Sequence, residues 1–226
     1  MNDKVFILIA GVNGAGKSTF YHSDYNIGDF FDFCDSNALQ DLHRVNADEI
    51  LREFGSWRDT NDSMKAGRIA VKKINDFLKE GASFCQETTL CGRGVIKNIN
   101  KAKDLGYKVG IIYVGIDSPE LAISRVEQRV QHGGHGVDEN DIRRRFYESF
   151  DNLNTIIDKC DGVLFFDNTS AFRSVAVFNG KDLHLTNSMG QPPKWFTDHI
   201  ALQPLEASVS LASNHDPLKK PKKDGR

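Results

Sequence analysis

Short, almost wholly apolar runs alternate along the chain with longer segments in which apolar residues recur every three or four positions. Five strands are predicted, at residues 5–10, 44–46, 83–87, 108–114 and 163–166, and several of them are continuous apolar runs. Continuous apolar runs are typical of a parallel sheet that is covered on both faces. The pattern therefore predicts an α/β fold with a mostly parallel five-stranded sheet and helices on both faces.

The periodic segments between these runs predict the helices. Residues 63–80 and 95–105 each carry an apolar stripe and each end before a glycine, which is a common helix stop. A third stripe runs through residues 139–158, and another helix is expected to begin near Ser118. We interpret these stripes as core-facing surfaces without a chemical role.

Two further features follow the last apolar run. Residues 174–185 resemble two short strands around Asn179–Gly180, which predicts a β-hairpin that caps the domain. From residue 201 the hydrophobic pattern fades, so residues 201–226 are expected to form a tail with a disordered end. Residues 1–200 are expected to form one domain.

Composition narrows the class of protein. The chain has 29 Lys and Arg against 31 Asp and Glu, and a net charge of -2 disfavours a general nucleic-acid-binding surface. The first residues lack the basic lead and cleavage site of a signal peptide, and no apolar run approaches the length of a membrane span. The four cysteines, Cys34, Cys85, Cys91 and Cys160, lack zinc-site spacing and are expected to be reduced. We expect a cytoplasmic protein without a nucleic-acid or membrane partner.

A glycine-rich loop follows the first predicted strand. Its sequence GVNGAGKST, residues 11–19, has the spacing of a Walker A phosphate-binding loop in the strand context that such a loop requires. Backbone N–H groups would surround the phosphates, Lys17 would reach the β- and γ-phosphates, and Ser18 would offer its hydroxyl to Mg²⁺. The nucleotide-binding residues expected here are Gly11, Asn13, Gly14, Ala15, Gly16, Lys17, Ser18 and Thr19.

Two acidic residues lie where an open α/β sheet binds its ligand, at the carboxyl ends of predicted strands. Asp48 follows the second strand in RVNADEI, and Glu87 ends the third in SFCQETTL. One carboxylate could accept the proton of an acceptor hydroxyl, while the other organises Mg²⁺ through water or grips the acceptor. The alternatives are a helix N-cap for Asp48 and a surface acid for Glu87.

Residues 128–146 enclose a glycine–histidine segment, HGGHG, between arginines, and they predict a lid. Arg125 and Arg129 share a helix face before this segment, and three consecutive arginines, residues 143–145, follow it. Arginines on a lid could stabilise the charge of a transferred phosphoryl group. Helical neighbours are about 100° apart, so the three cannot all face inward. At least one should be solvated or paired with an acid, and a wholly solvated charged face is the alternative.

Together these motifs resemble the zeta-toxin family of phosphate-loop kinases. The resemblance rests on GVNGAGKST, VNADEI, ETTL, YVGIDSPELAISRVEQRVQHGGHGV, IRRRFYESFDNL and FFDNTS, in this order over about residues 4–170. It implies a three-layer P-loop NTPase fold, ATP and Mg²⁺ as cofactors, and phosphoryl transfer to an alcohol. By resemblance, Asp48 is the catalytic aspartate, Lys17 and the loop bind ATP, Glu87, Thr88 and Thr89 line the acceptor site, and Asn168 lies near the nucleotide base.

The longer toxins of the family carry a different arginine-rich lid without GGHGV, so the matching arginines are open. We favour Arg129 and Arg145 as catalytic, with Arg144 and the substrate-binding candidate Arg125 behind them. The resemblance implies a nucleotide-sugar acceptor such as UDP-N-acetylglucosamine, and an antitoxin protein is a candidate partner. The alternatives are a housekeeping metabolite kinase on the same scaffold and a nucleotide-dependent switch or binding module.

Overall fold

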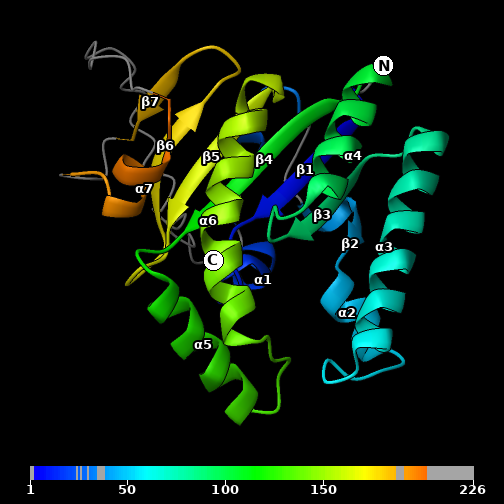
Figure 1. Ribbon diagram of the computed structural model, residues 1–226. Coiled ribbons are helices and arrows are strands. Elements are labelled where there is room, and N and C mark those ends of the chain that lie inside the picture. Colours follow the sequence, from blue (N-terminus) through cyan, green and yellow to red (C-terminus); the bar gives the residue numbers. More distant parts are fainter. Residues whose placement is uncertain are drawn as a thin grey trace, which may run out of the picture.

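A central β-sheet organises the part of the chain that the computed structural model describes, residues 3–202 apart from 24, 26, 30, 35–38 and 187–190. The seven strands lie in the order β2-β3-β1-β4-β5-β6-β7 (Figure 1). Their bounds are β1 Val5–Ala10, β2 His43–Val45, β3 Phe84–Thr88, β4 Lys108–Gly115, β5 Gly162–Asp167, β6 Arg173–Phe178 and β7 Leu183–Leu185. Strands β1 to β5 pair in parallel, which confirms the predicted α/β class.

The sheet has seven strands rather than the predicted five, because the hairpin extends it. Strand β6 pairs antiparallel with β5, and β7 pairs antiparallel with β6. In the hairpin loop, the side-chain oxygen of Asn179 accepts hydrogen bonds from the backbone N–H groups of Lys181 and Asp182. The Asn-Gly pair predicts that a turn forms, but it does not tell which strand the hairpin joins. The predicted hairpin therefore forms, and the predicted number of five strands was wrong because both of its strands join the sheet.

The described residues contain seven helices. They are α1 Lys17–Tyr21, α2 Ala47–Arg52, α3 Thr60–Glu80, α4 Arg93–Asp104, α5 Pro119–Gln131, α6 Glu139–Ile156 and α7 Lys194–His199, with short 3₁₀ turns at Ile27–Asp29, Leu39–Asp41 and Ile157–Lys159. Side-chain caps explain several starts, since Asp59, Ser118 and Asp138 accept hydrogen bonds from backbone N–H groups of the next turn. The long helices agree with the predicted stripes, whereas α2 and α7 were not predicted.

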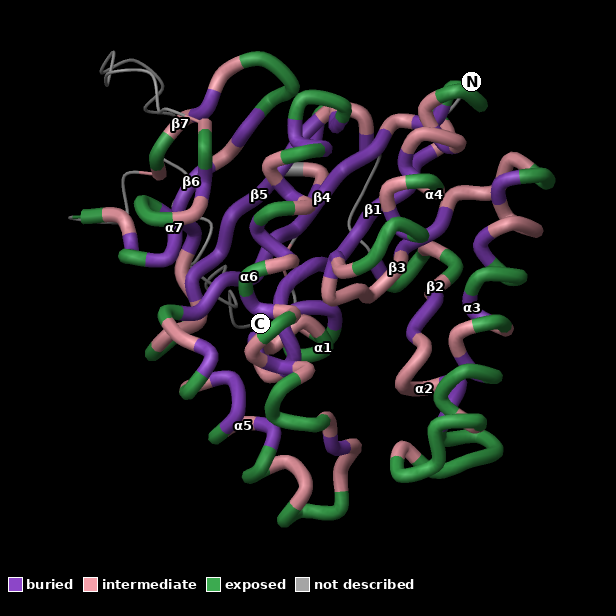
Figure 2. The backbone as a smooth tube through the Cα atoms, viewed as in Figure 1, coloured by how far each residue is buried: buried purple, intermediate pink, exposed green. Residues whose placement is uncertain are grey.

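Both faces of the sheet are covered, as neighbouring residues of β5 show. Phe165 packs edge-on against Phe196 of α7, while Phe166 packs against Phe20 of α1. Because successive side chains of a strand point to opposite faces, α7 and α1 lie on opposite sides of the sheet. Figure 1 shows α4 and α6 crossing the front of the sheet, and Figure 2 shows buried residues concentrated along the central strands. The result is three layers of secondary structure.

The carboxyl ends of the parallel strands meet at one edge of the sheet and define where the candidate site lies. The glycine-rich loop follows β1, Asp48 follows β2 by three residues, and Glu87 is the penultimate residue of β3. Cys85, Cys91 and Cys160 are free thiols. None of the helices among the described residues is both long enough and apolar enough to cross a membrane.

Candidate active site

The loop between β1 and α1 depends on glycine for its backbone conformation and for space. Gly11 and Gly16 have φ angles of 138° and 102°, which other residues rarely adopt. A β-carbon at Gly11 would lie 2.3 Å from the carbonyl oxygen of Val114, and one at Gly16 would lie 2.5 Å from Nδ2 of Asn168. The loop therefore takes a phosphate-loop shape that its sequence requires and that a substituted side chain would disturb.

Lys17 is the first residue of α1 and reaches back across this loop. Its Nζ donates hydrogen bonds to the carbonyl oxygens of Gly11, at 2.9 Å, and Val12, at 3.0 Å. The ammonium group is buried, although the residue as a whole keeps some exposed surface. Burial lowers the pKa of Lys17, and the carboxylates of Glu87 and Asp48 oppose this effect. The predicted lysine and both predicted acids therefore belong to one electrostatic neighbourhood.

Glu87 is almost fully buried, with a side chain only 5% exposed, and each of its carboxylate oxygens has a partner. Oε2 accepts a hydrogen bond of 2.8 Å from the hydroxyl of Ser18, and Oε1 pairs with the guanidinium group of Arg44. The alternative that Glu87 is a surface acid is therefore wrong. Its two contacts join α1 of the phosphate loop to strand β2.

The pair of Ser18 and Glu87 fits Mg²⁺ by its chemistry. A hydroxyl and a carboxylate oxygen 2.8 Å apart are hard ligands of the kind that Mg²⁺ prefers. The described residues contain no group of three or more His, Cys, Asp and Glu side chains that could hold a metal ion. A magnesium ion here would depend on phosphate oxygens and water for its other ligands, as is usual in nucleotide sites.

Asp48 does not cap its helix, because Asn46 does. The side-chain oxygen of Asn46 accepts hydrogen bonds from the backbone N–H groups of Asp48, at 2.9 Å, and Glu49, at 3.3 Å. The Asp48 carboxylate is 41% exposed and lies 3.7 Å from Nε2 of His135 in the lid. The N-cap alternative is therefore wrong, and the carboxylate faces the space between α2 and the lid.

The predicted lid, residues 128–146, comprises the end of α5, the loop at residues 132–138 and the start of α6, and its loop packs against Arg129. A β-carbon at Gly134 would lie 2.5 Å from Cγ of Arg129, so the loop closes tightly on this side chain. Nε and Nη2 of Arg129 are buried and have no hydrogen-bond partner among the described residues. Burial lowers the pKa of Arg129, and Asp48 opposes this effect. A buried guanidinium group with unused donors suits an anionic ligand.

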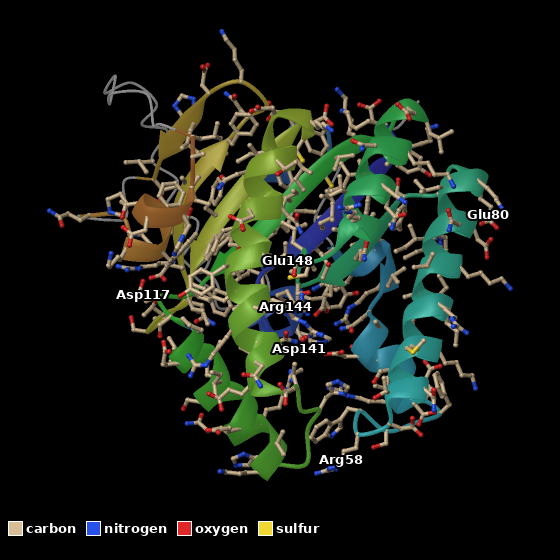
Figure 3. The ribbon with its side chains drawn as sticks, viewed as in Figure 1. Arg58, Glu80, Asp117, Asp141, Arg144 and Glu148 are labelled. Atoms are coloured by element: carbon tan, nitrogen blue, oxygen red, sulfur yellow. The ribbon has the colours of Figure 1, made fainter. Side chains whose placement is uncertain are left out.

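The three consecutive arginines of α6 divide as the helix geometry predicts. Arg145 points inward, where its Nη1 donates a hydrogen bond of 3.2 Å to Oδ1 of Asn13 in the phosphate loop. Arg143 pairs with acidic residues of α5 and α6, and Arg144 lies between its two acidic partners on α6 (Figure 3). The cluster is therefore not a wholly solvated face. Arg145 contacts the phosphate loop, whereas Arg143 and Arg144 lie on the exposed side of α6.

The remaining predicted residues lie around this centre. Asn168 donates a hydrogen bond of 2.8 Å from Nδ2 to the carbonyl oxygen of Ala15, which fastens the segment after β5 to the phosphate loop. Arg125 donates from Nη2 to the carbonyl oxygen of Thr169, so it lies beside the nucleotide candidates. The hydroxyl of Thr88 accepts a hydrogen bond from the backbone of the turn that follows β3. Thr89 is partly exposed at this turn, and Thr19 is exposed on α1.

Two residues with evident contacts at the site were not predicted. Arg44 pairs with Glu87, and Trp57 contacts the lid, because a β-carbon at Gly136 would lie 2.5 Å from the Trp57 ring. The guanidinium group of Arg58 lies over the same ring, 4.4 Å from its centroid. Arg44 and Trp57 lie far from their partners in sequence, so no local motif indicates these contacts.

A recess with a volume of about 990 Å³ lies at the opposite end of the strands, beside the first residues of β4 and β5. Its lining includes Asp161, which forms ion pairs with both Lys103 and Lys108. The lining contains none of the predicted site residues. We therefore place the candidate active site at the phosphate loop and not in this recess.

The parallel sheet, the loop after its first strand and the lysine folded into that loop define a phosphate-loop α/β protein. The chain belongs to the Zeta toxin family, whose model matches residues 2–175. This match confirms the family that the motifs indicate.

The chain is also similar to individual proteins and solved structures. An uncharacterized protein of Haemophilus influenzae (strain ATCC 51907 / DSM 11121 / KW20 / Rd) is 29% identical over 140 residues, which cover 62% of this chain and 91% of the relative. The AvrRxo1-ORF1:-ORF2 structure with ATP has a TM-score of 0.57 and 15% identity, and covers 82% of this chain and 61% of that one. The PezAT chromosomal toxin-antitoxin structure of Streptococcus pneumoniae has a TM-score of 0.54 and 16% identity, with coverage of 76% and 72%. The chain thus spans less than two thirds of the AvrRxo1-ORF1:-ORF2 chain, and both structures show a shared fold.

Proposed function

We propose that the protein is an ATP-dependent kinase that transfers the γ-phosphate to a hydroxyl of a small molecule, with a nucleotide sugar such as UDP-N-acetylglucosamine as the acceptor. The observation that carries the proposal is the carboxylate of Asp48. It is partly exposed, has no side-chain hydrogen bond among the described residues, and lies in the electrostatic neighbourhood of Lys17 and Arg129. A switch or a binding module would need no such free acid beside its phosphate site.

In the proposed reaction, Asp48 accepts the proton of the acceptor hydroxyl while the hydroxyl oxygen forms a bond to the γ-phosphorus. The bond between the γ-phosphorus and the bridging oxygen breaks, and ADP leaves. Lys17 binds the β- and γ-phosphates, while Arg129 and Arg145 stabilise charge on the transferred group. The products are ADP and a phosphate monoester of the acceptor.

Ser18, and Glu87 through water, would hold Mg²⁺, which when bound would neutralise charge on the phosphate oxygens. The phosphate loop, the buried Lys17 and Asn168 bonded to the loop support nucleotide binding. The complex of the similarly folded AvrRxo1-ORF1:-ORF2 with ATP supports ATP as the nucleotide. We assign Arg125 to the wall between nucleotide and acceptor, since it borders Thr169 and lies one helical turn before Arg129.

Membership in the Zeta toxin family supports the idea that a partner protein controls the activity. PezAT is described as a toxin-antitoxin system, and we extend that possibility to this chain as a proposal. The free thiols of Cys85, Cys91 and Cys160 fit the reducing environment of the cytoplasm, where we place the reaction. Residues 203–226, most of the expected tail, lie outside the described residues.

The test is a direct assay for phosphorylated product. The protein is incubated with ATP, Mg²⁺ and a panel of nucleotide sugars, free sugars and polyols, and mass spectrometry then detects the gain of one phosphate. Transfer to a nucleotide sugar supports the full proposal. Transfer only to another alcohol supports a metabolite kinase, and ATP hydrolysis that no acceptor stimulates favours a switch and contradicts the proposed role of Asp48.

Lys17→Ala is the control that ties any activity to the phosphate loop. The variant loses the ammonium group that should contact the β- and γ-phosphates, so turnover should fall to background. Its thermal unfolding midpoint should stay near that of the parent protein, because Lys17 contacts only two carbonyl groups of its own loop. Product formation at the parent rate would show that another site, or a contaminant, is responsible.

A further inference from the structure

Arg44 lies at the junction of four elements close to the phosphate loop. Its strand, β2, is three residues long and pairs only with β3. The side chain is 14% exposed, and its guanidinium group lies over the ring of Tyr21 in α1, 3.7 Å from the ring centroid. Nη1 pairs with Glu49 of α2 at 2.8 Å, and Nη2 pairs with Glu87 of β3. One side chain thus connects β2, β3, α1 and α2.

The Glu87 carboxylate has two neighbouring cations, Arg44 and Lys17. It pairs with Arg44, whereas Lys17 donates to backbone carbonyl groups and feels Glu87 only through the electrostatic field. A nearly buried carboxylate without a paired cation is costly, so a Glu87 that lost Arg44 would attract the next cation. That cation is Lys17, the residue expected to contact the phosphates.

We propose that Arg44 is a positioning residue that holds Glu87 beside Ser18 and thereby keeps Lys17 free for the nucleotide. The inference rests on the proposed nucleotide-binding function. Arg44 itself touches neither the phosphate loop glycines nor Asp48 in the contacts of the described residues, so its effect passes through Glu87.

The planar guanidinium group suits this task better than an ammonium group. Its two terminal nitrogens reach Glu49 and Glu87 at the same time, while its face packs on Tyr21. Although burial acts against the charged form, the hydrogen bond and charge of Glu87 raise the pKa of Arg44. Arg44→Lys keeps one positive charge but can satisfy the two carboxylates only in part, and Arg44→Met keeps the packing on Tyr21 without any charge.

A double-mutant cycle tests whether Arg44 acts through Glu87. Isothermal titration calorimetry measures binding of a non-hydrolysable ATP analogue, with and without Mg²⁺, to the parent protein, Arg44→Met, Glu87→Gln and the double variant. Arg44→Met should weaken binding about tenfold in the parent, because residues in one charged network couple at this scale. In the Glu87→Gln background the same change should alter affinity less than about twofold, since a neutral amide does not capture Lys17.

Each outcome separates this inference from the proposed function. A parent protein that does not bind the analogue defeats the nucleotide function, and the inference with it. A parent that binds while Arg44→Met binds equally well defeats the inference alone. Equal weakening in both backgrounds shows that Arg44 acts independently of Glu87, which also overturns it. Thermal unfolding checks that each variant folds; if Arg44→Met does not, Arg44→Lys replaces it in the cycle, with a smaller loss expected in the parent background only.

Discussion

Asp48 and Asn46 lie two residues apart at the start of α2, and they allow structure and chemistry to be separated at the scale of single residues. Asp48→Asn should retain nucleotide affinity but lower transfer about 10²–10⁴-fold, because an amide cannot accept the hydroxyl proton. Asn46→Ala removes the helix cap and should reduce the free energy of unfolding by about 1 kcal/mol. Rate measurements and urea unfolding on both variants check the pair. An Asp48→Asn variant that loses stability and keeps its rate would contradict the assignment.

The arginines of the lid give a second test at the residue scale. Arg129→Ala and Arg145→Ala should each lower kcat about 10²–10³-fold, because they remove charge that meets the transferred phosphoryl group. ATP affinity should change much less than kcat, since this charge develops mainly during transfer. Arg143→Ala is the matched control, because Arg143 pairs with surface acids. Equal, small effects at the three positions in steady-state kinetics would rule out a catalytic lid.

Among elements, the lid loop contacts the α2–α3 loop close to Asp48. The ring of Trp57 lies against Gly136, and the neighbouring His135 lies next to Asp48. In Gly136→Ala the new β-carbon would meet the Trp57 ring at 2.5 Å, so the ring or one of the two loops must shift and the contact should loosen. Water should then enter the site, and acceptor-independent hydrolysis should increase relative to transfer. The measured quantity is the ratio of free phosphate to phosphorylated acceptor.

Gly133→Ala provides the control for this element. Gly133 has a φ angle of 81°, and a β-carbon there would have no atom within 4 Å, so its substitution adds backbone strain without touching Trp57. Trp57→Ala combined with Gly136→Ala makes room for the new methyl group and should lower the ratio again. The same ratio in Gly133→Ala as in Gly136→Ala would show that loop strain, rather than the contact, is responsible.

The elements that the sequence predicts well are those whose signals are local. Strand β1 and the loop after it are adjacent in the chain, and both acids lie within a few residues of the ends of their strands, so position alone predicts that they lie at the carboxyl ends of the sheet. The pairing of Glu87 with Arg44 and the contact of Trp57 with Gly136 depend on how distant segments meet. Helices α2 and α7 have six residues each, too few for a periodic stripe to be recognised.

At the scale of the whole molecule, Asp167 connects the last parallel strand to the C-terminal elements. It is fully buried, accepts a hydrogen bond from the indole nitrogen of Trp195 in α7, and pairs with Arg173 of β6. The family resemblance implied that the next residue, Asn168, lies near the nucleotide base. The structure gives Asp167 a structural role, while Asn168 contacts the phosphate loop. Asp167 thus joins the hairpin and α7 to the sheet.

Asp167→Ala should lower the free energy of unfolding by about 1–3 kcal/mol, because it leaves the buried indole N–H of Trp195 without an acceptor. Urea unfolding measures this loss. Arg173→Ala removes only a half-exposed partner and should cost less than about 1 kcal/mol. If both substitutions cost the same, the ion pair rather than the indole contact holds these elements together.

The sheet ends on both sides in a strand of three residues, β2 at one edge and β7 at the other. An unpaired strand edge invites strand addition by a second copy, and a short edge carrying polar side chains offers little length for it. Histidine occupies β2 at position 43 and β7 at position 184, and Arg44 is already bound within its own subunit. Concentrated samples should therefore resist edge-to-edge aggregation, although the central parallel strands β1, β4 and β5 are strongly apolar.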